Sequence, residues 1–498
     1  MHKEILISTE PQEKRVAIVE DGRLEEFYVE RTTTDRIVGN IFKGKVESIA
    51  SGIGAAFINI GMGKNGFLYI SDIVGLSEEL EEDVEIVHRR KTKPDVKRID
   101  EEVKKGQEIM VQVTKEAFGT KGCRLTSKIS LPGRYLVLMP NSSHIGISKR
   151  IEDRKERDRL RQILEDLRIP EEMGVIVRTV GEKKSKKDFI RDLKFLLKLW
   201  ARIKVNFQRS SAPALLHKEH GLIFRILRDV FTDQINKLVV DSKDEFREIM
   251  HYLSQLAPHM KPRLEFYRDM EPLFEKRKIE LQIEKIYDRK VELKGGGYLI
   301  IEQTESLVAI DVNSGKYVGK KDIEETVFIV NMEAAKEVAR QIKLRDLGGI
   351  IVIDFIDMKF AEHRKKVFQA LEEHVKADKA KTNILHISEL GLIQMTRQRS
   401  RKPIESIAYQ VCPYCSGKGA TKSIQTMAIT TIRKVKAFFN INRNIRKIEI
   451  LVHPDVASRL FNEDRNSVTY LERHYRANIN IKPDPSLHIE QVKIEKLM

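Results

Sequence analysis

Cysteine is scarce in this sequence, and long apolar runs are missing from it. The chain has 3 cysteines in 498 residues, so we expect no disulfide framework, and a reducing compartment is indicated. No run of about 18 apolar residues, the length that spans a bilayer, occurs in it. Met1 to Glu4 leads directly into a short predicted strand, so no signal peptide is expected. We therefore expect a cytoplasmic protein without a membrane partner.

Acidic residues are too few to balance the basic ones. The 90 lysines and arginines outnumber the 74 aspartates and glutamates, which gives a formal net charge of +16 and a pI near 9.4. This excess favours a polyanionic partner, with nucleic acid first among the candidates. Charge alone does not choose between RNA, DNA and anionic lipid, although no basic amphipathic membrane helix stands out.

Two short apolar runs in the third quarter of the chain each end on an aspartate. Residues 307–310 run into Asp311, with Asn313 close behind, and residues 350–353 run into Asp354. Runs of this length that are rich in β-branched residues are typical of buried strands. Between them, apolar residues recur at helical spacing over 322–344. Strand, helix and strand form a βαβ unit, so the two strands should be parallel.

The carboxyl ends of parallel strands meet at one edge of a sheet, which is where ligands gather. If the strands are neighbours, about 4.8 Å apart, Asp311 and Asp354 can share one hard cation. A single aspartate after a strand is more often a turn or cap residue than a ligand. Two aspartates at equivalent strand ends, with Asn313 close to the first, make a metal site as good an interpretation as a pair of turn or cap residues. Asp357 is a weaker candidate, which we expect to cap the next helix.

The same residues carry a resemblance to a known family. The segments 309–314, 322–326, 344–349 and 351–358 resemble the catalytic segment of the ribonuclease E/G family of bacterial endoribonucleases, and the similarity extends over nearly the whole chain. The resemblance implies that Asp311 and Asp354 hold Mg²⁺ and that Asn313 supports them by hydrogen bonding. It also implies a DNase I-like catalytic subdomain over residues 282–404.

Residues 1–36 contain three predicted strands, and residues 206–281 alternate predicted helices and strands. Among the latter, 222–225 and 238–241 are expected to be strands. The resemblance implies that the two segments form one ribonuclease-H-like subdomain without catalytic carboxylates, so its role is structural.

Short predicted strands with glycine turns fill residues 37–128 and resemble an OB-fold barrel of the S1 type. The resemblance implies that Phe57, Phe67 and Lys121 contact single-stranded RNA, by base stacking in a positive groove. Without it, a lone phenylalanine on a strand would be interpreted as core. The charged segment 77–105 is expected to be a solvated insertion in a barrel loop.

For residues 129–205 the resemblance implies a sensor of a 5′-monophosphate on the RNA end. Its residues would be Gly133, Val137, Lys149, Arg178 and Thr179. An arginine beside a hydroxyl suits this role because the guanidinium fork binds phosphate bidentately, although such a pair is otherwise ordinary surface chemistry. The family has arginine at the position of Lys149, so that contact is weaker here or is taken over by the next residue, Arg150.

Cys412 and Cys415 form a CxxC pair in the segment 405–420, which is half of a tetrahedral zinc site. Cys123 lies in the predicted barrel, and neither His386 nor His453 is close in sequence. The same pair from a second chain would complete the site across a two-fold axis, and the zinc link of the family resembles this arrangement. We expect a zinc-linked homodimer, with a tetramer left open; the alternative is a zinc-free turn.

The sequence thus predicts an α+β or α/β multidomain protein that ends in a small α+β domain over 421–498. The function it predicts is an Mg²⁺-dependent endoribonuclease that cleaves single-stranded RNA, is stimulated by a 5′-monophosphate, and leaves 5′-phosphate and 3′-hydroxyl ends. Ribosomal RNA processing and messenger RNA decay are the expected roles. We expect no long disordered tail after the last domain, which favours the ribonuclease G branch of the family. The alternative function is a non-catalytic RNA-binding protein that uses the barrel and the basic faces.

Overall fold

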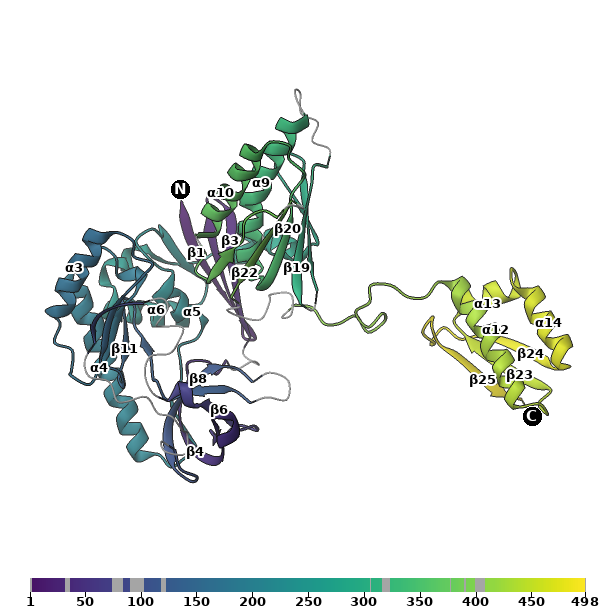
Figure 1. Cartoon of the computed structure of the whole chain (residues 1–498), viewed down its shortest axis with the longest axis horizontal. Coiled ribbons are helices and arrows are strands. Elements are labelled where there is room, and N and C mark those ends of the chain that lie inside the picture. Colours follow the sequence, from purple (N-terminus) through teal and green to yellow (C-terminus); the bar gives the residue numbers. More distant parts are fainter. Residues whose placement is uncertain are drawn as a thin grey trace. The chain divides into compact units, whose positions relative to one another are not determined.

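The chain folds into two compact units, residues 1–404 and 405–498, which are described separately (Figure 1). None of the helices in the described part of the chain is long and apolar enough to cross a membrane. The computed structural model describes residues 2–31, 36–73, 84–89, 103–117, 122–304, 306–315, 323–376, 378–388, 391–398 and 408–497.

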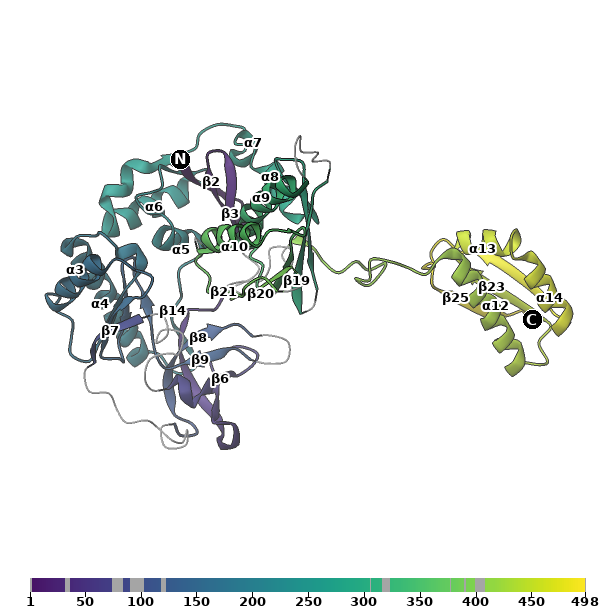
Figure 2. The same cartoon turned by 45° about the horizontal axis from the view of Figure 1, so that its top comes forward.

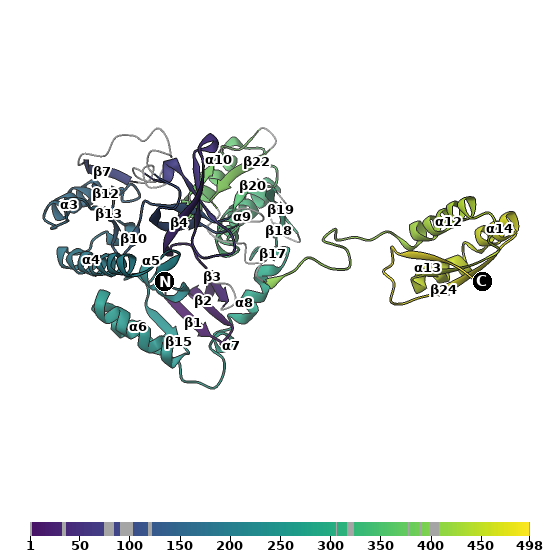
Figure 3. The same cartoon turned by 90° about the horizontal axis from the view of Figure 1, so that it is seen from below.

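The first sheet joins the N-terminus to residues more than 200 positions away. Its strand order is β3-β2-β1-β15-β16, with the first three strands antiparallel and the last two parallel to β1. Alternate side chains of a strand face opposite sides, so Ile5 and Ile7 pack against one helical layer and Leu6 against another. Figure 3 shows α6 beside β15, with α7 and α8 on the other side of the strands. The elements are β1 (Lys3–Thr9), β2 (Glu13–Glu20), β3 (Arg23–Arg31), α5 (Leu222–Asp229), β15 (Lys237–Val240), α6 (Lys243–Leu256), β16 (Leu264–Phe266), α7 (Leu273–Lys276) and α8 (Glu280–Glu284).

The strand predicted for residues 222–225 is wrong, because these residues open helix α5. Leu222, Ile223, Ile226 and Leu227 are all buried against the sheet. Their spacing is that of one helical face. A run of three apolar residues followed by an arginine is too short to reveal its period, whereas the eight-residue window shows the helix.

A closed five-stranded barrel follows, in the order β4-β5-β6-β9-β8 with β8 returning to β4. Strands β6 and β9 are parallel, and the other pairs are antiparallel. This is the OB-fold barrel that the sequence predicted, and β14 from residues 214–217 extends it beyond β4. The elements are β4 (Ile41–Ala50), β5 (Ala55–Asn59), β6 (Gly66–Tyr69), β8 (Glu108–Lys115), β9 (Arg124–Thr126) and β14 (Ala214–His217).

The third sheet has the order β10-β11-β13-β12-β7 and packs against α3 and α4. Its edge strand β7 lies inside the segment 77–105, so the expectation of a solvated barrel insertion is wrong for residues 84–89. Val84 is buried there, and Glu85 pairs with Arg157 and Arg161 of α3. The elements are β7 (Val84–Arg89), β10 (Leu131–Pro132), β11 (Leu136–Met139), β12 (His144–Ser148), α3 (Arg154–Glu165), β13 (Gly174–Val177) and α4 (Lys186–Arg209).

The fourth sheet carries the βαβ unit, with the order β17-β18-β19-β20-β22-β21. Strands β19 and β20 are parallel neighbours joined through α9, as the sequence predicted. Helices α9 and α10 pack on the face that buries Val308, Ile310 and Ile353, and Figure 2 shows both helices on one side of the sheet. The elements are β17 (Lys290–Glu292), β18 (Tyr298–Gln303), β19 (Leu307–Asn313), α9 (Ile323–Leu344), β20 (Gly349–Asp354), α10 (Ala361–Lys376), β21 (Thr382–Ile384) and β22 (Leu392–Arg397).

The second unit is a small α+β domain with its own core. Its sheet has the order β24-β23-β25, with β24 parallel and β25 antiparallel to the central strand. The elements are α12 (Ile424–Ile441), β23 (Lys447–Val452), α13 (Pro454–Phe461), α14 (Arg465–Tyr475), β24 (Asn478–Pro483) and β25 (Val492–Lys496).

Candidate active site and RNA interface

Asp311 and Asp354 lie directly opposite each other on the parallel strands β19 and β20. Each follows a fully buried isoleucine, and each side chain is exposed. The reason is the two-residue period of a strand: Ile310 and Ile353 face the helices, so the next residues face the open side of the sheet. The two carboxylates therefore stand side by side at the carboxyl end of both strands.

Asn313 is placed on the same face as Asp311, two residues further along β19. Its Nδ2 donates a hydrogen bond of 2.8 Å to Oδ2 of Asp311. Oδ1 of Asp311 takes no part in this hydrogen bond. The bond also restricts the rotation of the carboxylate. The structure thus brings Asn313 into contact with Asp311, the residue that the resemblance expects it to support.

A third carboxylate adds to the negative charge of this edge. The pKa of Asp354 is raised, first by partial burial and then by the charges of Asp311 and Asp357. We expected Asp357 to cap the next helix, but α10 begins only at Ala361, so that expectation is wrong. Asp357 is exposed, and its charge reaches Asp354 instead.

The donor set of this edge fits a hard divalent cation. Among the residues described, no three histidine, cysteine or acidic side chains converge on a ready-made metal cage. Mg²⁺ does not need one, because it keeps several waters and binds through one or two carboxylates. A cation between Asp311 and Asp354 would also relieve the repulsion that raises the pKa of Asp354.

The loop after Asp354 is held by two polar side chains of α9 that the sequence analysis overlooked. Asn331 is fully buried and forms two hydrogen bonds with the backbone of Ile356, one to its N–H and one to its carbonyl. The carboxylate of Glu324 accepts hydrogen bonds from the N–H groups of Lys359 and Phe360. Asn331 stands among apolar residues of the helix face, so only its polarity at a core position signalled a role.

The predicted phosphate sensor gathers around the end of β13. The Nη1 atom of Arg178 donates a hydrogen bond of 2.8 Å to the carbonyl of Gly133 and lies 2.7 Å from Oδ1 of Asp229. Burial favours the neutral form of Asp229, but Arg178 and Arg228 outweigh it and lower the pKa of that carboxyl. Arg178 is thus already ion-paired, which the sequence analysis did not foresee. Thr179 is exposed beside it.

Gly133 belongs to a tightly built turn. The buried carboxylate of Asp192 accepts hydrogen bonds from the N–H groups of residues 134, 135 and 136. A Cβ atom on Gly133 would lie 2.6 Å from Oδ2 of Asp192, so the turn has no room for another side chain. Val137 follows on β11, opposite Ile176 of β13, so it lies near Arg178.

Two further residues of the sensor region lie at the end of β12. Lys149 is exposed directly after this strand. Arg150, the candidate replacement for it, donates a hydrogen bond of 2.8 Å to the carbonyl of Lys379.

On the barrel, Phe57 and Phe67 are cross-strand neighbours of β5 and β6. Their ring centroids are 5.0 Å apart and their planes are tilted by 58°. Both rings are half-buried, so part of each remains available for stacking. Tyr69 is exposed two residues beyond Phe67, with the Arg124 guanidinium 5.4 Å from its ring. Its period-two spacing from Phe67 could have signalled it. Lys121 lies outside the described residues.

Comparison with known proteins decides the family. Residues 130–400 match the model of the Ribonuclease E/G family, and residues 36–126 match that of the S1 RNA binding domain. The chain is 37% identical over 494 residues to ribonuclease G of Salmonella typhimurium (strain SL1344), with 99% of each chain covered. The chain belongs to the ribonuclease E/G family. It is therefore an endoribonuclease.

Other members of the ribonuclease E/G family are equally similar. Ribonuclease G of Haemophilus influenzae is 38% identical over 492 residues, again with 99% of both chains covered. Ribonuclease E of Escherichia coli (strain K12) is 38% identical over 474 residues, which are 95% of this chain and 44% of the relative. Residues 411–497 match a further model of the family, described as a thioredoxin-like domain.

The cysteine pair of this ribonuclease E/G chain lies at the start of its second unit. The backbone N–H of Gly419 donates a hydrogen bond of 3.3 Å to Sγ of Cys415. Hydrogen bonds from the backbone of Cys415 and Tyr414 lower the pKa of Cys412, which favours the thiolate that metals bind. A histidine that the sequence analysis did not consider, His488, lies against this loop, with Nε2 2.6 Å from the carbonyl of Tyr414.

Proposed function

We propose that this endoribonuclease cleaves single-stranded RNA with Mg²⁺ held by Asp311 and Asp354. The observation that carries the proposal is the register of β19 and β20, which sets the two exposed carboxylates side by side. When bound there, Mg²⁺ would polarise the phosphate and lower the pKa of a water molecule. Attack by water leaves a 5′-phosphate and a 3′-hydroxyl, because the 2′-hydroxyl of the RNA need not react.

The chain's own residues orient the parts of this reaction. Asn313 fixes one oxygen of Asp311 by its hydrogen bond, so the other is available to the metal. Phe57 and Phe67 offer tilted, half-buried rings on which successive bases stack, and stacking tolerates different sequences. The excess of basic residues attracts the phosphate backbone. RNA bound along the barrel would be presented to the carboxylates as a single strand.

The 5′ end of the RNA is proposed to bind at Arg178 and Thr179. A terminal phosphate carries more charge than the Asp229 carboxylate and has more acceptor oxygens, so it can share or replace the ion pair of Arg178. The carbonyl of Gly133 and the residues Val137 and Lys149 border the same strand ends. Binding there would stimulate cleavage by holding the rest of the strand in place.

We further propose that residues 1–36 and 206–281 form a ribonuclease-H-like subdomain and that residues 282–404 form a DNase I-like subdomain. Residues 405–420 would form a zinc link. The zinc ion would join two chains through Cys412 and Cys415, and the location would be the cytoplasm. Ribosomal RNA processing and messenger RNA decay are the roles that this chemistry serves. The membership of the ribonuclease E/G family and the paired carboxylates both argue against the alternative function, a purely RNA-binding protein.

One experiment tests the cleavage chemistry. A short single-stranded RNA, labelled at either end, is incubated with the protein and Mg²⁺, and the ends of the products are mapped. We expect internal cuts that carry 5′-phosphate and 3′-hydroxyl groups, and no reaction in excess chelator. Cyclic phosphate ends, or cutting in the presence of chelator, would contradict the proposed mechanism.

A further inference from the structure

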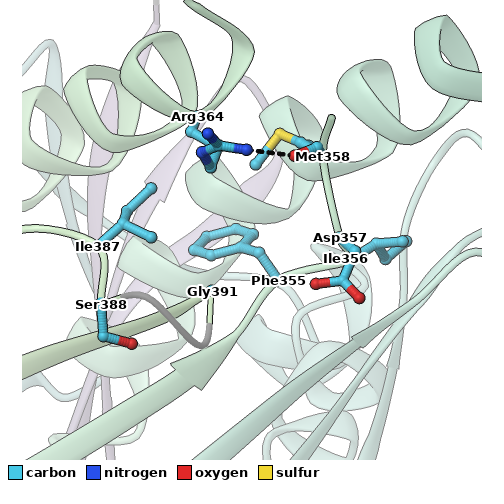
Figure 4. A pocket seen from close by; sticks show the side chains of 8 residues that line it. All are labelled: Phe355, Ile356, Asp357, Met358, Arg364, Ile387, Ser388 and Gly391. Carbon is cyan, nitrogen blue, oxygen red and sulfur yellow. Dashed lines mark hydrogen bonds between the residues drawn. The ribbon is translucent and has the colours of Figure 1, made fainter. Parts of the chain in front are cut away.

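A pocket of about 350 Å³ is lined by residues 355–358, which follow Asp354 in the chain, together with residues of α10 and of the segment after β21 (Figure 4). This volume lies at the lower end of the range of small-molecule sites, roughly 300–1,000 Å³. Figure 4 shows the Phe355 ring and the Ile387 side chain facing the hollow, with the Asp357 carboxylate at its rim. The pocket therefore combines an apolar wall with one acidic group, and the proposed Mg²⁺ ligand Asp354 immediately precedes it in the chain.

One wall of the pocket, formed by residues 355–358, is held in place by side-chain hydrogen bonds. Asn331 clamps both polar groups of Ile356, at 3.1 Å to its N–H and 2.8 Å to its carbonyl. From the other side, Nη1 of Arg364 donates a hydrogen bond of 2.5 Å to the carbonyl of Met358. The carboxylate of Glu324 accepts hydrogen bonds from the N–H groups of the next two residues, Lys359 and Phe360. A loop held from both sides by side-chain hydrogen bonds needs no reordering when a ligand enters, which favours binding.

The chemistry of the pocket suits a flat, partly apolar ring with hydrogen-bonding groups on its edge. Ile387 is half-buried and offers an apolar surface for such a ring, while Phe355 and Met358 line the same pocket with only a small exposed area. An ionised carboxylate only accepts hydrogen bonds. Asp357 therefore favours a ring edge that carries an amino group and disfavours one that carries only carbonyls. Gly391 lies close to this carboxylate, because a Cβ atom on Gly391 would be 3.4 Å from Oδ1 of Asp357.

We infer that this pocket binds the base of a nucleotide adjoining the scissile phosphate, and that Asp357 selects bases with an exocyclic amino group over uracil. The inference rests on the proposed function, because that function brings the RNA to Asp354. The amino groups of cytosine and adenine can donate to Asp357. The ring N–H of uracil lies between two carbonyl oxygens that would face the carboxylate. One charged hydrogen bond corresponds to a preference of roughly tenfold.

The test uses RNAs that share one cleavage site and differ in a single flanking base. At each flanking nucleotide the base is uracil, cytosine, adenine or absent, and pairs of RNAs compete in one tube. The parent should cut the cytosine RNA roughly tenfold faster than the uracil RNA at one flanking position. Competition reports a ratio, so any general slowing that follows from the charge next to Asp354 cancels.

Three variants assign that ratio to the pocket. Asp357→Asn, which can also donate to a carbonyl, should bring the cytosine-to-uracil ratio near one. Ile387→Trp fills the hollow and should make the abasic RNA as good a substrate as the others. Glu362→Gln is the matched control, because it removes an exposed carboxylate that pairs with Lys366 on α10, outside the pocket. It should keep the parent's ratio.

The outcomes separate this inference from the proposed function. If the parent cuts RNA but shows no base preference at any flanking position, no base binds in the pocket. The same conclusion holds if a preference exists and both Asp357→Asn and Ile387→Trp retain it. If the parent cuts none of the RNAs in Mg²⁺, the proposed function itself fails.

Discussion

The two candidate metal sites of this chain each offer two charged ligands, but they are built in opposite ways. Asp311 and Asp354 stand on neighbouring strands of one sheet and are brought together by 43 residues of βαβ chain. Cys412 and Cys415 have only two residues between them, in a loop at the start of the second unit. The first pair provides hard oxygen atoms, and the second provides soft sulfur atoms.

The difference matters because the two metals tolerate missing ligands differently. Mg²⁺ fills the rest of its octahedron with water and substrate oxygens. Two carboxylates within one chain are therefore enough, and open positions serve the reaction. Structural zinc is closed by four protein ligands. Two thiolates therefore leave a half site, which only another part of this chain or a second chain can complete. The same ligand count thus predicts catalysis in one place and assembly in the other.

The largest effect should follow from a change in the carboxylate pair. Asp354→Asn or Asp311→Asn removes one ligand charge and keeps the side-chain shape. Loss of several kcal/mol of metal stabilisation should slow cleavage roughly a thousandfold or more. Single-turnover cleavage in Mg²⁺ measures the loss, and fluorescence anisotropy should show nearly unchanged RNA binding. Glu302→Gln, on the neighbouring strand, is the control. Full activity of Asp354→Asn would falsify the assignment.

The cysteine pair should govern assembly. The parent should hold about half a zinc ion per chain, because four thiolates from two chains surround one ion. Cys412→Ser combined with Cys415→Ser should release the zinc and yield monomers, as measured by native mass spectrometry and metal analysis. Cys123→Ser is the control, since this thiol is buried in the barrel and burial raises its pKa. His488→Ala checks completion within one chain. One full zinc per chain, with no change in mass for the double variant, counts decisively against the shared site.

A change outside both metal sites should have a smaller and more selective effect. The parent should cut a 5′-monophosphorylated RNA about tenfold faster than its 5′-hydroxyl twin, because charged hydrogen bonds hold the phosphate. Arg178→Ala should slow only the phosphorylated substrate and erase the difference. Arg191→Ala removes a surface arginine of α4 that lies near Asp188, and it should keep the difference. Equal rates in the parent would mean that the sensor, with Lys149 in place of arginine, does not operate here.

The sequence correctly predicted the features that depend on the pattern of apolar and polar residues along single strands. Two apolar runs around a helix predicted parallel strands, and the strand period placed Asp311 and Asp354 on one face. The barrel was also predicted, since glycine turns separate its strands. Each of these features depends on residues within one continuous segment, so local pattern was sufficient to identify it.

The features that were missed depend on contacts between distant segments. Asp229 pairs with Arg178 across 51 residues of sequence, and nothing in either segment specifies the other. Strand β7 has three β-branched apolar residues in its six, but the charged sequence on both sides hid this signal, and its pairing with β12 identifies it. Asn331 lies on a helix face whose other residues are mostly apolar. Nothing in the local sequence shows that its polar partner is the backbone of Ile356. Such contacts follow from tertiary packing.

The smallest effect should come from Asn313, which orients a ligand without carrying charge. Asn313→Ala removes the hydrogen bond to Asp311 and frees that carboxylate to rotate. The bond is exposed, so its loss should cost about 1 kcal/mol, or roughly fivefold. Because orientation affects metal binding first, the loss should appear as a higher Mg²⁺ requirement and shrink at saturating Mg²⁺. Titrating cleavage rate against Mg²⁺ measures it, with Asn383→Ala, exposed on β21, as the control. A defect as deep as that of Asp354→Asn at saturating Mg²⁺ would instead make Asn313 a direct ligand.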